Sequence, residues 1–276
     1  MRIDAHQHFW KIDRGDYGWI TPELPALYRD FLPEHLKSSL AKHGLDGTIA
    51  VQAAPTLAET DYLLSLADAD DSIVGVVGWL DLHDPNHRDH YRRMASHPKF
   101  VGFRIMIQEM SDASRILEPA FVEALRSYAD EDVPIDLLVR SDQLEPLTRV
   151  LALVPNLRGV VDHLAKPAIA AGSLEPWLSQ MREIAGHSGI YCKLSGMVTE
   201  ADHAAWKYDQ FQPYVRHASE LFGSDRVLFG SDWPVCLLAA SYDQVVEAIE
   251  RNLPEGWGEA ERARLYGLNA KEFYQL

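Results

Sequence analysis

A regular alternation between short apolar runs and segments with helical periodicity constrains this chain more than any other feature. Several of the runs are nearly continuous in Val, Ile, Leu and Gly, as is typical of strands covered on both faces in a parallel sheet. We predict eight strands, at Arg2–His6, Gly47–Ala53, Ser72–Gly78, Phe100–Met106, Val133–Val139, Leu157–His163, Gly189–Ser195 and Arg226–Asp232.

The segments between these runs carry helix signals. Thr56-Leu-Ala-Glu59 is a capping-box pattern that opens a helix. Phe121, Leu125 and Tyr128 lie at positions i, i+4 and i+7 of one helix face. Similar apolar stripes run through Leu144, Leu147, Leu151 and Val154, through Trp177, Met181 and Ile184, and through Val245 and Ile249. These stripes indicate core packing.

Eight strand-then-helix units in 276 residues predict a (β/α)8 barrel of the TIM type, with a single domain over residues 1–276. An open, doubly wound sheet is the alternative. It loses support because no Gly-x-Gly-x-x-Gly motif follows the first strand. No linker or low-complexity tract divides the chain.

The charge and hydropathy of the chain exclude several classes of partner. The formal net charge of −15 argues against nucleic acid and against an anionic membrane surface. No segment has the roughly 20 apolar residues of a membrane span, and no signal-peptide pattern opens the chain. We therefore expect a cytoplasmic protein with a small-molecule substrate. Whether copies associate as a homo-oligomer is left open.

The two cysteines, Cys192 and Cys236, provide no disulfide framework and no metal-binding spacing. Each is best interpreted as a small buried hydrophobic residue, and a catalytic thiol is the less favoured alternative.

Functional groups of a (β/α)8 barrel lie at the carboxyl ends of its strands. An extended chain through the first strand puts His6 and His8 on one face, because side chains alternate with a period of two. Asp232 ends a buried apolar strand, where a carboxylate is costly unless it is paired or binds a ligand. An ion pair or a core histidine would explain any one such residue. The polar residues at these ends are His6, His8, Gln52, Arg104, Gln108, Asp162, His163, Lys166, Lys193, Ser195 and Asp232.

Two connections are long and aromatic. The first runs from Phe9 to about Leu32 and contains Trp10, Tyr17 and Trp19. Long loops in compact domains are often lids or binding loops, although these aromatic rings equally suit packing against the barrel rim. The second follows Ser195 and holds Met197, His203, Trp206 and Tyr208, which are candidates for the wall of a pocket.

These residues carry a family resemblance that spans the chain. His6-x-His8, His163 and Asp232 resemble the amidohydrolase superfamily pattern. A fuller set of motifs resembles the sugar-lactonase branch, the L-fuconolactone and L-rhamnonolactone hydrolases. The motifs are Asp4-Ala-His-Gln-His-Phe-Trp10, Tyr17-Gly-Trp19, Gly102-Phe-Arg104, Asp162-His-Leu-Ala-Lys-Pro167, Cys192-Lys-Leu-Ser-Gly196, Leu228-Phe-Gly-Ser-Asp-Trp-Pro234 and Asn269-Ala-Lys-Glu-Phe273.

The resemblance implies hydrolysis of a sugar-derived lactone to its aldonic acid. Asp232 would be the general base on the attacking water. The histidines, or a metal that they hold, would stabilise the oxyanion, and Arg104 would bind the oxyanion or ring hydroxyls. Lys193 is a further candidate electrophile or an ion-pair partner. The candidate substrate-binding residues are Trp10, Trp19, Lys166 and Trp233, of which the tryptophans equally suit packing.

One departure from the family pattern bears on the cofactor. Metal-dependent members usually add a histidine at the end of strand five, and the segment from Val133 to Arg140 has none. His6, His8 and Asp232 would supply the three protein ligands of a zinc ion, and some relatives are thought to work without metal. A metal-dependent decarboxylase, a catalytically inactive barrel that binds a sugar acid, and a hydrolase of dicarboxylic lactones are the alternative functions.

Overall fold

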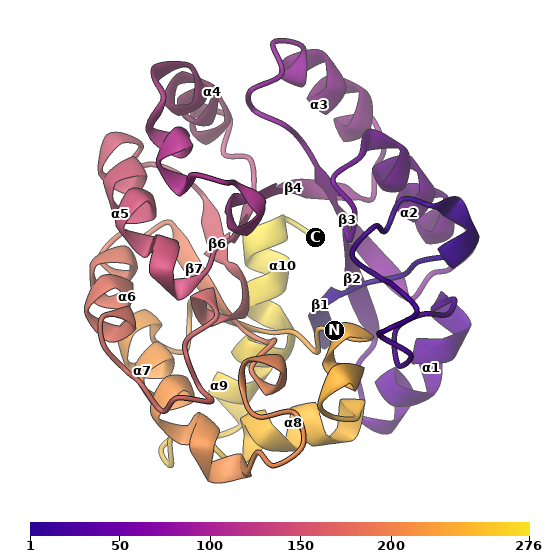
Figure 1. The fold of residues 1–276 in the computed structure, drawn as a ribbon, viewed down its shortest axis with the longest axis vertical. Coiled ribbons are helices and arrows are strands. Elements are labelled where there is room, and N and C mark those ends of the chain that lie inside the picture. The colour runs from indigo at the N-terminus through magenta and orange to yellow at the C-terminus, as the bar shows by residue number, and fades with distance from the viewer.

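The computed structural model describes residues 1–276, and its centre is a barrel of eight parallel strands (Figure 1). Neighbouring strands follow chain order from the first to the eighth, as a (β/α)8 barrel requires. The prediction of this fold is confirmed. The strands are β1 (Ile3–Gln7), β2 (Gly47–Val51), β3 (Ile73–Trp79), β4 (Phe100–Met106), β5 (Ile135–Leu138), β6 (Gly159–Val161), β7 (Ile190–Leu194) and β8 (Val227–Phe229).

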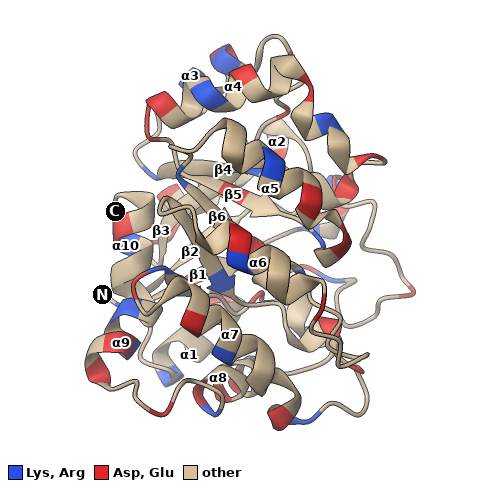
Figure 2. Ribbon diagram, turned by 90° about the vertical axis from the view of Figure 1, so that its left-hand side faces the viewer, with Lys and Arg blue, Asp and Glu red and all other residues tan.

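Helices surround the strands, and both acidic and basic residues are scattered along them rather than gathered on one face (Figures 1 and 2). None of these helices has the length and apolar character needed to cross a lipid bilayer. The helices are α1 (Pro33–Lys42), α2 (Leu57–Ala69), α3 (His87–Ala95), α4 (Pro119–Asp130), α5 (Leu144–Leu153), α6 (Trp177–Ala185), α7 (Gln212–Phe222), α8 (Tyr242–Glu250), α9 (Glu259–Ala263) and α10 (Asn269–Tyr274).

The barrel closes between β8 and β1 through the backbone of the residues that carry the expected chemistry. The Asp232 amide donates to the His6 carbonyl at 2.8 Å, and the His8 amide donates to the Trp233 carbonyl at 2.7 Å. Asp4 adds a side-chain link, because its carboxylate accepts from the Ser231 amide at 2.9 Å. Closure therefore sets Asp232 directly beside His6 and His8.

The predicted strands at Leu157–His163 and Arg226–Asp232 are too long. β6 ends at Val161 and β8 ends at Phe229, so His163 and Asp232 lie just beyond the regular strands. Both residues have left-handed backbone conformations, with φ of 54° and 56° respectively. A continuous apolar pattern predicts the buried strand well, but it does not show where the backbone turns to expose a polar group.

A small cluster of ten buried residues fills the inside of the barrel, and a much larger one packs the helices against its outside. Helix α10 contributes to the inner cluster, with Ala270, Phe273 and Tyr274 packed among strand residues. Cys192 and Cys236 are fully buried, and burial raises the pKa of both thiols. Both cysteines are therefore core residues, as predicted.

The capping box predicted at Thr56 forms only in part. The Thr56 side chain accepts from the Glu59 amide at 3.1 Å, as expected. The Glu59 carboxylate instead turns back to the end of β2, where it accepts from the amides of Ala53 and Ala54 at 2.8 Å each. Glu59 thus fixes the β2–α2 turn, which borders the cavity described below.

Candidate active site

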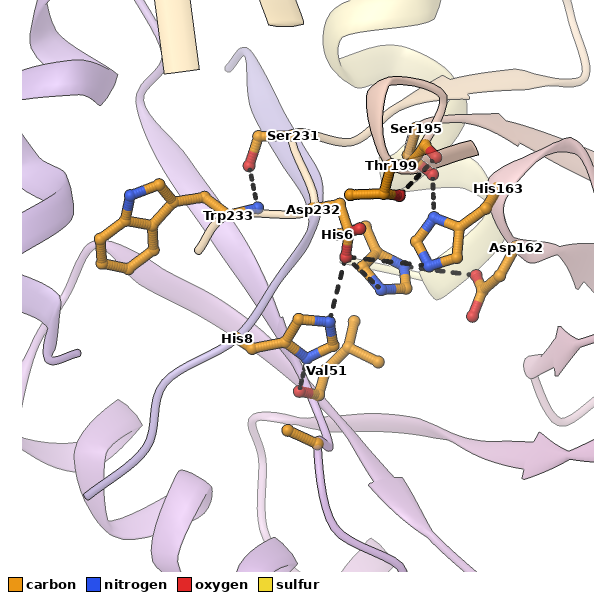
Figure 3. Close-up of polar contacts among 12 residues, drawn as sticks. His6, His8, Val51, Asp162, His163, Ser195, Thr199, Ser231, Asp232 and Trp233 are labelled. Carbon is orange, nitrogen blue, oxygen red and sulfur yellow. Dashed lines mark hydrogen bonds and ion pairs between the residues drawn. The ribbon is translucent and has the colours of Figure 1, made fainter. Parts of the chain in front are cut away.

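Three imidazoles converge on one carboxylate at the open end of the barrel (Figure 3). Asp232 Oδ1 lies 3.3 Å from His8 Nε2, 3.8 Å from His163 Nε2 and 3.9 Å from His6 Nε2. All four residues are buried, with no more than 4% of each exposed. The sequence-based prediction that these four side chains meet at one end of the barrel therefore agrees with the geometry.

The surroundings of these residues set their protonation. Burial alone would raise the pKa of Asp232, but the neighbouring His163, His8 and His6 outweigh it and hold that pKa well below its usual value. Burial lowers the pKa of His163 to about 4 and holds that of His6 well below its ordinary value. At neutral pH the cluster therefore contains an ionised Asp232 beside neutral rings of His6 and His163.

The donor set formed by His6, His8 and Asp232 fits a divalent cation. His8 Nδ1 lies 2.8 Å from the Val51 carbonyl, and His6 Nδ1 lies 3.3 Å from Asp162 Oδ1. Because the Val51 carbonyl can only accept, the His8 ring carries a proton on Nδ1 and turns its Nε2 toward Asp232. His6 Nδ1 lies between the Asp162 carboxylate and a donor, Lys193 Nζ at 3.2 Å, so the contacts of Nδ1 alone do not fix the proton of His6. The ligand atoms of His6, His8 and Asp232 lie within 4.8 Å of one another, a spacing that suits three ligands of one divalent cation.

Arg104 borders this cluster and is itself firmly held. Its guanidinium donates to both the backbone and the side-chain oxygen of Gln52, and Nη1 lies 3.3 Å from Asp162 Oδ2. Nη1 is also 3.5 Å from His6 Nε2, which agrees with a bare nitrogen at that position. A fixed positive charge beside one ligand weakens the hold of the site on a metal ion.

Beneath the cluster lies a completely buried ion network. Lys193 Nζ pairs with the Asp136 carboxylate, lies 3.1 Å from Asp162 Oδ1, and is 3.2 Å from His6 Nδ1. The Tyr274 hydroxyl donates to Asp136 at 2.7 Å. Burial acts to raise the pKa of Asp162, but Lys193 and His6 outweigh it and hold that pKa well below normal. Two roles were predicted for Lys193, electrophile and ion-pair partner, and its contacts support the second.

His163 begins a left-handed turn that has a conformational cost. The four residues from His163 to Lys166 all have positive φ, between 50° and 58°. Such conformations cost roughly 1–2 kcal/mol for each non-glycine residue. The turn is tied down by the Lys166 amide, which donates to the His163 carbonyl at 2.8 Å, and by Trp177 Nε1, which donates to the Leu164 carbonyl at 2.6 Å. Strain of this kind is typical of functional sites.

A cavity of about 310 Å³ opens above Asp232 and is bordered by His8, His163 and Arg104. The Trp19 indole lies at its edge, where Nε1 donates to the Ala53 carbonyl at 2.8 Å. Lys166 also reaches the cavity. The other lining residues received no role from the sequence, namely Ala53, Pro55, Met106, Gln108, Glu109, Leu138 and Val235.

Trp10 and Trp233 do not line this cavity, which argues against the substrate-binding role predicted for them. Trp10 is fully buried in the first long loop, and its Nε1 donates to the Arg29 carbonyl at 2.9 Å. The Trp233 ring packs edge-on against Phe31 and points away from Asp232 (Figure 3). Both rings hold the loop against the barrel, because a large apolar surface is most stable when buried.

The second long loop also lies outside the cavity. Met197 is buried, and the Trp206 indole donates to the Ala239 carbonyl at 2.8 Å. The Tyr208 hydroxyl bonds to Glu247 of α8 at 2.5 Å. Of the two long loops, only the first contributes an aromatic ring to the cavity, through Trp19.

A larger cavity, of about 570 Å³, lies at the opposite end of the barrel beside the carboxyl terminus. Its walls are mainly apolar and include Val101, Pro134 and Leu276. It contains no cluster of acid and base groups like that around Asp232. The smaller cavity is therefore the candidate active site.

Comparisons with known proteins agree with this architecture. An L-fucono-1,5-lactonase from Burkholderia ambifaria is 39% identical over 100% of this chain and 96% of its own length. A second L-fucono-1,5-lactonase, from Burkholderia multivorans, is 37% identical with the same coverage. A crystal structure of an amidohydrolase from Burkholderia multivorans with bound zinc superposes with a TM-score of 0.93, at 37% identity, and covers 100% of this chain and 99% of that one.

The amidohydrolase family model matches residues 3–276, which is nearly the whole chain. The match includes His6 of β1, His8 just beyond it, the turn after β6 and the segment after β8, which together form the cluster around Asp232. The protein belongs to the amidohydrolase family.

Proposed function

We propose that this protein is a hydrolase that opens a sugar-derived lactone to its aldonic acid. The observation that carries the proposal is an ionised, buried Asp232 beside three imidazoles on the floor of a small cavity. Two relatives that match over the full chain, at 39% and 37% identity, are named L-fucono-1,5-lactonase. Their shared name favours a lactone of the L-fucono type.

In this proposal Asp232 takes a proton from the water that attacks the lactone carbonyl. The ring ester bond then breaks, and the same proton passes to the departing ring oxygen, which leaves a free hydroxyl and a carboxylic acid. The second proton of the water is released to solvent when this acid ionises to the carboxylate. Arg104 and His163 border the cavity beside Asp232, where their N–H groups meet the carbonyl oxygen as it gains negative charge. The network of Gln52 and Asp162 keeps Arg104 in place for this task.

His6, His8 and Asp232 would hold a divalent cation such as zinc, which when bound polarises a carbonyl and makes a bound water more acidic. The choice of zinc is supported by the crystal structure of the amidohydrolase from Burkholderia multivorans, which is 37% identical and contains bound zinc. The single carboxylate among the three ligands, and the nearby Arg104 guanidinium, favour a loosely held metal.

The walls of the cavity suit a neutral, polyhydroxylated ring. Gln108, Glu109 and Lys166 offer hydrogen-bonding groups, while Met106 and Leu138 offer apolar surface. The Glu109 carboxylate repels an anionic substrate, which counts against the dicarboxylic lactones. The decarboxylase alternative also loses support, because β5 ends at the cavity with Leu138, whose side chain cannot bind a metal.

A pH-indicator assay of the purified protein against a panel of aldonolactones, with and without a chelator, tests the proposal. We expect acid release from L-fucono-1,5-lactone and none from a dicarboxylic lactone. The absence of release from every aldonolactone, with and without added zinc, would contradict the proposed function and favour an inactive sugar-acid-binding barrel.

A further inference from the structure

The imidazole of His163 is held differently from those of His6 and His8. His8 Nδ1 faces the Val51 carbonyl, which fixes a proton there, and the donor Arg104 Nη1 lies 3.5 Å from His6 Nε2, which favours a bare Nε2 on His6. His163 Nδ1 instead lies 2.8 Å from the hydroxyl of Ser195, at the end of β7. A hydroxyl can donate or accept, so the rest of its surroundings must decide the direction of this bond.

Both ends of the His163 ring favour a proton on Nε2. Ser195 is 1% exposed, and its hydroxyl has no hydrogen-bond partner other than His163. With a proton on Nδ1, that buried hydroxyl would donate to nothing, and the bare Nε2 would face the carboxylate of Asp232 at 3.8 Å. With the proton on Nε2, Ser195 donates to Nδ1 and the ring presents an N–H toward Asp232.

The turn after β7 is shaped around this contact. Gly196 has a φ of 60°, and a Cβ added there would lie 2.5 Å from His163 Nδ1 and 2.6 Å from its Cγ. Only glycine therefore leaves room for the ring beside Ser195. Gly230, just beyond β8, leaves room for both His6 and Ser195, because a Cβ there would lie 2.6 Å from the Cβ of His6 and 3.1 Å from that of Ser195. These two glycines therefore allow the close approach of His163 and Ser195, whose Nδ1 and hydroxyl oxygen lie 2.8 Å apart.

We propose that Ser195 is a positioning residue that holds His163 as its Nε2–H tautomer. His163 then donates a hydrogen bond to the carbonyl oxygen of the lactone, while His6 and His8 present lone pairs for a cation. This division of roles among three neighbouring imidazoles rests on the proposed lactonase function. The assignment of the tautomer itself rests only on the contacts of Ser195 and His163.

The tautomer is read directly from long-range ¹H–¹⁵N correlation spectra of metal-free protein labelled with ¹⁵N-histidine. A spectrum of His163→Asn assigns the His163 signals. We expect Nε2 of wild-type His163 to show the shift of a protonated nitrogen and Nδ1 that of a bare one. Ser195→Ala should shift this pattern toward the Nδ1–H form or a mixture. A protonated Nδ1 in the wild type would overturn the proposal.

Kinetics provide the second readout. Ser195→Ala is expected to lower kcat by roughly tenfold to a hundredfold with little change in KM, the range typical of residues that orient an active-site group. Ser195→Thr keeps the hydroxyl and should recover most of the loss. The matched control is Thr199→Val, which removes a hydroxyl that bonds to the Gly196 carbonyl at 3.0 Å in the same turn. It should leave both kcat and the tautomer unchanged.

The outcomes separate the two proposals. An Nε2–H tautomer in a wild-type protein that hydrolyses no lactone would overturn the proposed function and leave the assignment of Ser195 in place. Lactone hydrolysis that Ser195→Ala leaves unchanged would overturn the positioning role alone.

Discussion

The polar interior of the barrel has two layers that are built in opposite ways. In the deep layer, Lys193 meets Asp136 and Asp162, and the Tyr274 hydroxyl completes the shell of Asp136. In the cavity layer, the Asp232 carboxylate approaches three ring nitrogens, and none of these distances is below 3.3 Å. In the deep layer each carboxylate is paired with a cation, Asp136 with Lys193 and Asp162 with both Lys193 and Arg104, whereas the cavity layer leaves Asp232 available to a ligand. We infer that the deep layer stabilises the fold and orients the residues above it, and that the cavity layer carries out the chemistry.

The largest effect on stability is expected where a charge of the deep layer loses its partner. Lys193→Met leaves Asp136 and Asp162 buried without their ammonium group and should lower the free energy of unfolding by about 3–5 kcal/mol. Denaturant unfolding measures this change. The matched control is Lys166→Met, at the cavity edge, which should cost less than about 0.5 kcal/mol. Equal stability of the two variants would remove the distinction between the layers.

A change in the cavity layer should instead affect cation binding. His8→Ala removes a bare nitrogen beside Asp232 and should weaken zinc binding by roughly a hundredfold, with a smaller loss of stability than in Lys193→Met. Competition against a chromophoric chelator measures the affinity. His43→Ala, on the outside of the barrel beside Asp243, is the control and should bind zinc like the wild type. Unchanged affinity in His8→Ala would exclude this ligand set.

The two tryptophans of the first loop sharpen the comparison. Trp10→Phe deletes a buried donor to the Arg29 carbonyl and should lower the free energy of unfolding by about 1–3 kcal/mol, with KM unchanged. A shift in KM without a loss of stability would restore Trp10 as a substrate-binding residue. Thermal unfolding and lactone kinetics measure the two quantities.

The smallest effect is expected at the cavity edge. Trp19→Phe keeps an aromatic ring but loses the bond to the Ala53 carbonyl, so KM should change only a few-fold, as expected for the loss of one neutral hydrogen bond. The thermal midpoint should stay within a few degrees of the wild type. A variant with an unchanged KM would show that Trp19 borders the cavity without contacting the substrate.

The barrel, and the meeting of His6, His8, His163 and Asp232 in it, could be predicted from the sequence. Strands are recognised from local apolar patterns, and functional groups of a (β/α)8 barrel lie at the carboxyl ends of its strands. The sequence did not predict the roles of Asp136 and Tyr274. These two residues are 138 positions apart and meet only when α10 lies against the barrel. Their pairing is a product of tertiary packing, which no local pattern encodes.

The substrate-binding role predicted for Trp10 and Trp233 failed for a related reason. A tryptophan at a barrel rim suits stacking on a sugar and packing on a loop equally well, and only the exposure of each ring decides. Trp19 is 41% exposed, whereas Trp10 is fully buried.

Ser195 was located at the end of its strand, but its contact with His163 depends on the left-handed turn after β6 and on Gly196. In the sequence, the residues that make this contact are marked only by the pairs Asp162-His163 and Ser195-Gly196.

The most direct test of the account is the rate of acid release from L-fucono-1,5-lactone by Asp232→Asn and wild-type protein at equal metal content. We predict that turnover falls by roughly 10²–10⁴-fold while the thermal midpoint stays close to that of the wild type, because Asp232 acts on the substrate rather than on the fold. Turnover close to wild type in a folded Asp232→Asn variant would contradict the account and leave the cavity layer without its base.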